Sequence, residues 1–250
     1  MKKIVLIISG IVIIIFATTS LTLLLSLRAT TANTLGYQDA QEYSKKQGGE
    51  ALIIYETKKD QIVLEDYHNG HSDSDPHIVY SGTKSFIGVA LTMLIEQDYK
   101  PEILNPLGID IDQWERNSDG RPKLDADSYM TAQEWLEFGK FVYYTIEKDE
   151  HTLIDPGIMK QLIESQPGTQ DYGITFWLKP NPDVNPDNVD LNDIISSISG
   201  NYRYKGEFYA AARAQDQRLM FLPDENLIVV RIAQRQRLYS DNEMIKRIMQ

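Results

Sequence analysis

The apolar positions of the chain fall into one long N-terminal run and several short segments separated by polar residues. ALIIYE (51–56) and IVLEDY (62–67) flank a charged turn, a pattern typical of an antiparallel hairpin. Four more apolar runs predict strands, namely YGITFWL (172–178), EFYAAAR (207–213), QRLMFL (217–222) and LIVVRIA (227–233). The chain therefore contains two groups of strands, one before and one after its central third.

The helical segments lie mainly between these groups. A helix that opens near Ser81 is apolar on nearly all sides, which is typical of a buried helix. Thr131 and Glu134 form a capping box ahead of an amphipathic helix over 132–148. Three shorter helices are predicted over 36–46, after Pro156 and from Asp241. Paired strands, a block of helices and a final meander predict an α+β fold, with helices packed on an antiparallel sheet.

The long N-terminal run has the features of a membrane segment. Lys2 and Lys3 precede 24 uncharged residues from Ile4 to Leu27, enough for a helix that crosses a bilayer. The two lysines favour a cytoplasmic N-terminus, so everything after Arg28 is expected outside the cytoplasm. We therefore divide the chain into a single-pass anchor over 1–33 and a domain over 34–250. The alternative is a signal removed at Thr30-Thr31-Ala32, which would give a secreted protein.

Composition narrows the classes of partner. Lys2, Lys3 and Arg28 are the only charges before residue 34, so the domain has 22 basic and 36 acidic residues, a net charge of −14. This acidic balance argues against nucleic acid as a partner. The chain has no cysteine, which excludes disulfides, thiolate metal sites and a cysteine nucleophile. The sequence implies no metal and no organic cofactor.

Ser81-Gly82-Thr83-Lys84 is the segment that most directly suggests chemistry. A serine and a lysine three residues apart at the start of a helix lie on the same face, so the amine is within reach of the hydroxyl. An activated serine needs such a neighbouring base, and burial among apolar residues favours the neutral amine. The pair predicts a serine hydrolase of the SxxK kind. The alternative is a serine at a helix start beside a lysine that extends toward solvent.

Several segments before and after Ser81 occur in an order that matches one protein family. They are VLEDYHNG (63–70), IVYSGTKSFIG (78–88), PLGI (106–109), Trp114, Asp119-Gly120, LDADSYMTAQEWLEFGKFV (124–142), YGITFWL (172–178) and AQDQRLMFLPDENLIVVRIA (214–233). With this order the chain resembles, over residues 38 to 250, the serine β-lactamase-related hydrolases, which include class C β-lactamases, D-alanyl-D-alanine carboxypeptidases and several esterases.

The resemblance implies acyl transfer through an ester on Ser81, with Lys84 as general base. It also implies an oxyanion hole made by the N–H of Ser81 and an N–H of the strand over 210–214, with Ala214 as a binding residue. Trp177 is a candidate pocket wall, and Arg213 a candidate contact for an acidic substrate group. A small molecule or a peptide is the expected substrate.

The chain departs from this family at two motifs. The middle helical subdomain with its Tyr-x-Asn or Ser-x-Asn is apparently missing, since the chain is shortened around 97–105. Tyr67-His68-Asn69 and Ser240-Asp241-Asn242 lie outside the family position, and Ser240 fits a helix N-cap better. The third motif, Lys-Thr-Gly or His-x-Gly, is replaced by AARAQ at 211–215. Tyr80 and Tyr99 are the nearest hydroxyls in sequence that could stand in for the missing tyrosine.

The remaining polar clusters predict solvated loops. His68, His71 and His77 share a loop with Asp73 and Asp75, but their spacing matches no known metal-ligand pattern, so we assign no metal to them. NPDVNPDNVD (181–190) lacks the glycine and terminal glutamate of an EF-hand loop.

The sequence thus predicts an extracytoplasmic serine hydrolase that acts on an amide or ester. A catalytically degenerate binding scaffold and a truncated remnant are the alternatives.

Overall fold

A computed structural model describes residues 34–96, 107, 114–120, 123, 127–149, 154–180, 202–213, 216–234 and 239–250. Its strands are β1 (Gly49–Glu56), β2 (Gln61–Tyr67), β3 (His77–Ile78), β4 (Tyr129–Met130), β5 (Tyr209–Arg213), β6 (Gln217–Leu222) and β7 (Leu227–Ala233). Its labelled α-helices are α2 (Thr83–Glu96), α3 (Ala132–Lys148), α4 (Pro156–Lys160) and α6 (Asp241–Ile248), and a further helix spans 34–46.

Five strands form an antiparallel sheet in the order β2-β1-β7-β6-β5. The N-terminal hairpin therefore joins the C-terminal meander through β1 and β7, and β2 and β5 form the two edges. A separate pair, β3 with β4, lies beyond the sheet. The predicted α+β class and the predicted hairpin are confirmed.

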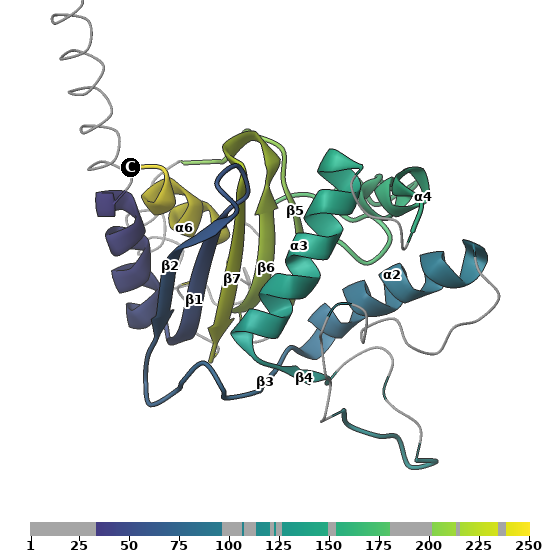
Figure 1. The fold of residues 1–250 in the computed structure, drawn as a ribbon, viewed down its shortest axis with the longest axis horizontal. Helices are drawn as coiled ribbons and strands as arrows, with labels where there is room; N and C mark the ends of the chain where they lie inside the picture. Colours follow the sequence, from purple (N-terminus) through teal and green to yellow (C-terminus); the bar gives the residue numbers. More distant parts are fainter. Residues whose placement is uncertain are drawn as a thin grey trace, which may run out of the picture.

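Helices cover both faces of the sheet (Figure 1). Alternate residues of β1 point to opposite faces, so Ile53 packs with the α3 side chains while Ile54 packs with helix 34–46 and α6. Because β1 and β7 are buried on both faces, their sequences are mainly apolar instead of alternating; Glu50 and Glu56 in β1 and Arg231 in β7 are the charged exceptions.

The N-terminus of α3 has the predicted capping box. The Glu134 N–H donates to Thr131 Oγ1 at 3.1 Å, and the Thr131 N–H donates to Glu134 Oε2 at 2.7 Å. These two bonds satisfy backbone donors that the first helical turn leaves unpaired. They fix the point at which the chain leaves β4 and crosses the sheet as α3.

One predicted strand is wrong. Residues 172–178 form turns, with isolated bridges from Trp177 to Tyr172 and to Ala210. Thr175 has a φ of +74°, a left-handed conformation that interrupts an extended chain. Ser85 Oγ on α2 donates to the Thr175 carbonyl at 2.8 Å, which ties this turn to the helix behind Ser81.

No helix within the described residues is long and apolar enough to cross a membrane. The predicted anchor over 1–33 and the predicted shortening around 97–105 fall outside the described residues, as does the 181–190 segment.

Candidate functional site: the Ser81 turn

Ser81 lies on a single 3₁₀ turn, Tyr80–Gly82, between β3 and α2. Tyr80 has a φ of +45°, so the chain turns sharply one residue before the serine. The Val79 N–H donates to the Ser128 carbonyl at 2.9 Å and ties the turn to the segment that precedes β4. The serine is therefore presented at a bend whose two sides are both anchored.

Two buried hydroxyls hold the inner side of this bend. Thr83 Oγ1 donates to the Tyr80 carbonyl at 2.5 Å and lies 2.9 Å from Ser128 Oγ. The Ser128 N–H donates to the same Thr83 oxygen at 3.2 Å. Thr83 and Ser128 are both fully buried, so these bonds provide partners for polar groups whose burial would otherwise be unfavourable.

Lys84 Nζ donates to Ser81 Oγ at 3.1 Å. This is the contact that the three-residue spacing predicts, and both side chains are partly exposed. The distance lies within the range in which a base can take the proton of a nucleophile. The structure therefore brings together the two residues that the sequence singles out for chemistry.

The Ser81 turn packs close to α3 and to the sheet. A Cβ atom on Gly82 would come within 3.0 Å of the Trp135 ring, so glycine lets the turn approach this fully buried side chain. The turn also contacts strands β5 and β6. Ser81 is thus placed beside the edge of the sheet that β5 forms.

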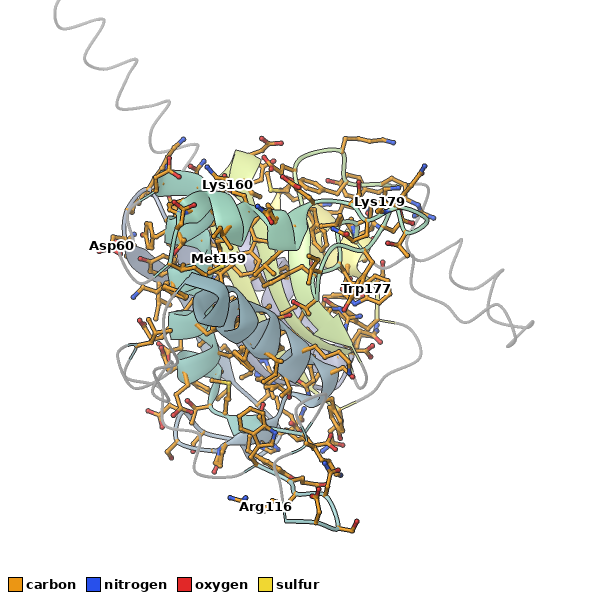
Figure 2. All side chains as sticks on the ribbon, turned by 90° about the vertical axis from the view of Figure 1, so that its right-hand side faces the viewer. Asp60, Arg116, Met159, Lys160, Trp177 and Lys179 are labelled. Atoms are coloured by element: carbon orange, nitrogen blue, oxygen red, sulfur yellow. The ribbon has the colours of Figure 1, made fainter. Side chains whose placement is uncertain are left out.

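Trp177 lies along the outer edge of β5. Its backbone exchanges two hydrogen bonds with Ala210, at 2.9 and 2.8 Å, and its indole N–H donates to the Ala212 carbonyl at 3.2 Å. Trp177 is 36% exposed, and Figure 2 shows it at the surface. The Trp177 side chain therefore stands beside the edge of β5. The Arg213 side chain and Ala214 fall outside the described residues.

The Tyr-x-Asn and Ser-x-Asn residues lie away from Ser81, and its neighbour Tyr80 is poorly suited to accept a proton. Tyr67 ends β2, the edge of the sheet opposite β5, and Asn69 donates to the Gly49 carbonyl at 2.8 Å. Ser240 caps α6 by accepting the Glu243 N–H at 3.1 Å, as the sequence predicts. Burial, together with the nearby Asp127, raises the pKa of the Tyr80 phenol, the direction opposite to that needed in a proton acceptor. Tyr99 lies outside the described residues.

The histidine loop is a correction to the sequence analysis. His68 and His77 are each 7% exposed, so they are buried and not solvated. His71 and His77 both contact the carboxylate of Glu50, at 3.0 and 3.2 Å. One residue in the sequence could have indicated this cluster. Glu50 is an acid near the start of a largely apolar strand, and a buried carboxylate requires a hydrogen-bonding or charged partner.

No protein-family model and no curated protein sequence matches the chain. Solved structures do match it. A protein described as a 6-aminohexanoate-dimer hydrolase from Bacillus anthracis is similar with a TM-score of 0.56 and 12% identity, over 83% of this chain and 78% of that one. A β-lactamase from Mycobacterium bovis is similar with a TM-score of 0.53 and 10% identity, over 84% and 96%. A penicillin-binding protein homologue from Caulobacter crescentus gives 0.55 and 8%, over 88% and 96%.

The chain has a β-lactamase-like fold. At identities of 8 to 12% the likeness is one of fold, and it agrees with the resemblance seen in the order of the sequence segments. Within the β-lactamase-like fold of this chain, the SxxK pair stands at the turn that contacts β5 and β6.

Proposed function

We propose that the protein is a serine hydrolase that transfers the acyl group of an amide or ester to Ser81 and then to water. The observation that carries this proposal is the 3.1 Å contact between Lys84 Nζ and Ser81 Oγ, at a turn beside the sheet edge in a β-lactamase-like fold. Fold alone does not determine function, so the pair and its setting are the argument.

In the proposed reaction, Ser81 Oγ attacks the carbonyl carbon while Lys84 Nζ takes the hydroxyl proton. The proton passes to the leaving nitrogen or oxygen as its bond to the carbonyl carbon breaks, which leaves an ester on Ser81. Water then attacks that ester, Lys84 takes the proton of the water, and Ser81 recovers a proton on release of the acid. The N–H of Ser81 and an N–H of the strand over 210–214 are proposed to bind the oxyanion.

The substrate is proposed to be a small molecule or a peptide that lies along the β5 edge beside Trp177. We also propose that residues 1–33 anchor the domain outside the cytoplasm, on the basis of the apolar run and its two preceding lysines.

One observation favours a second function. AARAQ at 211–215 lacks the hydroxyl and the glycine of the family's third motif, which suits a scaffold that binds a peptide or cell-wall fragment without turnover.

Covalent labelling separates the two functions. The full chain in detergent is incubated with a fluorophosphonate and, separately, with a penicillin, and its intact mass is measured. We expect one adduct in the wild type and in the loop variant Ser72→Ala, and none in Ser81→Ala. Lys84→Met should slow labelling by roughly 10²- to 10⁴-fold, because it removes the base. A folded wild type that gains no mass would contradict the hydrolase and leave the scaffold.

A further inference from the structure

Glu50, His71 and His77 converge from three separate segments of the chain. Glu50 is the second residue of β1, His71 lies in the loop after β2, and His77 lies in β3. Glu50 Oε1 is 3.0 Å from His71 Nε2, and Glu50 Oε2 is 3.2 Å from His77 Nδ1. The three donor atoms lie within 4.8 Å of one another.

The cluster is held in place by contacts from outside it. The Gln234 side-chain amide donates to Glu50 Oε1 at 2.7 Å and orients the carboxylate. The His68 N–H donates to the Glu50 carbonyl at 2.8 Å, and Asn69 donates to the Gly49 carbonyl at 2.8 Å. The histidine loop is therefore fastened to the start of β1 by the His68 backbone and the Asn69 side chain, and does not depend on the cluster for its path.

His77 is the more deeply buried of the two histidines. It is 93% buried, and Nδ1 is its ring nitrogen that faces Glu50. Its Nε2 atom, on the other side of the ring, has no hydrogen-bond partner among the described residues. The nitrogen that His77 offers to an ion beside Glu50 is therefore Nδ1.

We propose that Glu50, His71 and His77 form a binding site for a divalent transition-metal ion such as zinc. Two imidazole nitrogens and one carboxylate oxygen are a donor set that suits zinc and its neighbours better than calcium or magnesium. Donors on a tetrahedral zinc are about 3.3 Å apart at ordinary bond lengths. The two nitrogen-to-oxygen contacts, at 3.0 and 3.2 Å, involve the two different oxygens of Glu50, and the three ligand atoms lie within 4.8 Å of one another. Side-chain movements that bring these atoms closer together would complete the site.

The site opens toward the Ser81 turn. A cavity of about 360 Å³ is lined by Glu50, His77, Tyr80 and Gln234, among others. Since His77 and Tyr80 both precede Ser81 in one short segment, an ion at this site would fasten that segment to β1. The proposal concerns metal binding and is independent of whether Ser81 reacts.

The test is direct metal binding by the full chain in detergent. Zinc is titrated against a chromophoric chelator, and bound metal is counted by elemental analysis after gel filtration. We expect one zinc per chain, unaffected by excess magnesium or calcium. Glu50→Gln and His77→Asn should each weaken zinc by roughly 100-fold, and Gln234→Ala by about 10- to 100-fold because it orients the carboxylate.

Matched variants keep the result interpretable. His71→Asn changes a partly exposed loop residue, so it tests the site even if the buried variants fail to fold. His68→Asn is the control, because His68 pairs with Asp66 at 2.8 Å and lies outside the cluster. Zinc bound equally by the wild type, His71→Asn and His68→Asn would overturn the proposal, as would a folded wild type that binds none.

Discussion

The backbone of Tyr80, the residue before Ser81, determines how the serine is presented. Tyr80 adopts a left-handed backbone, a conformation that costs a non-glycine residue about 1–3 kcal/mol and persists only where its surroundings impose it. Here the Thr83 hydroxyl and the Asp127 N–H both donate to the Tyr80 carbonyl, at 2.5 and 3.2 Å. The bend that presents the serine is therefore fixed by hydrogen bonds to its own backbone.

Glu147 allows a pH-dependent test at the scale of one residue. Burial raises the pKa of this carboxyl, Glu207 adds to the increase, and the Tyr209 hydroxyl, which donates to Glu147 at 3.2 Å, opposes it. The folded state therefore keeps the proton to a higher pH than the unfolded chain. Its contribution to stability is fully present below the unfolded pKa, near 4.3, and is lost as the pH rises through the folded pKa.

Glu147→Gln removes the titrating carboxyl and should therefore remove this loss of stability at higher pH. We expect the variant to gain in free energy of unfolding, relative to wild type, between pH 4 and pH 7, as measured by urea denaturation at both values. Glu137→Gln, on the exposed face of α3, is the control and should show no such gain. An equal difference between variant and wild type at both pH values would contradict the raised pKa of Glu147.

At the scale of elements, the sequence predicts the features that depend on residues close together in the chain. Thr131 and Glu134 predict the start of α3, because the capping box is made by two residues that are three positions apart in the sequence. The strand predicted over 172–178 failed because Thr175 takes a left-handed conformation and its carbonyl is bound by Ser85, from a distant helix. His71 and His77 could not be placed from sequence, since their partner Glu50 belongs to another element.

The α3 cap gives the prediction at this scale. Thr131→Ala should lower the free energy of unfolding by about 1 kcal/mol, because the first turn loses the hydroxyl that accepts the Glu134 N–H. Thr131→Ser keeps this acceptor and should stay close to wild type. Urea denaturation measures both, and equal losses in the two variants would show that the hydroxyl is not the cause.

For the whole molecule, a buried ion pair joins the sheet to the C-terminal helix. Arg218 Nε on β6 donates to Asp241 Oδ1 at the start of α6, at 2.8 Å, and both side chains are at most 3% exposed. Buried pairs of this kind add little compared with an apolar replacement, but removal of one partner leaves a buried charge without its nearest counter-charge.

Asp241→Asn should therefore lower the free energy of unfolding by about 3–5 kcal/mol. Glu137→Gln breaks the exposed pair with Lys140 and should cost less than about 1 kcal/mol. Thermal and urea unfolding of both variants measure the difference. Similar small losses in the two would mean that α6 does not depend on this pair.

The pairing of β1 with β7 also governs when the domain can fold. Glu56 pairs with Leu227 and Gly49 with Ala233, so strand β1 of the N-terminal hairpin waits for β7, the last strand among the described residues. At synthesis rates of about 5–20 residues per second, the roughly 170 residues between them take on the order of 10–40 s to emerge. Until then β1 has only β2 beside it and one of its edges is unpaired, so the domain completes its sheet later than a protein built from local contacts.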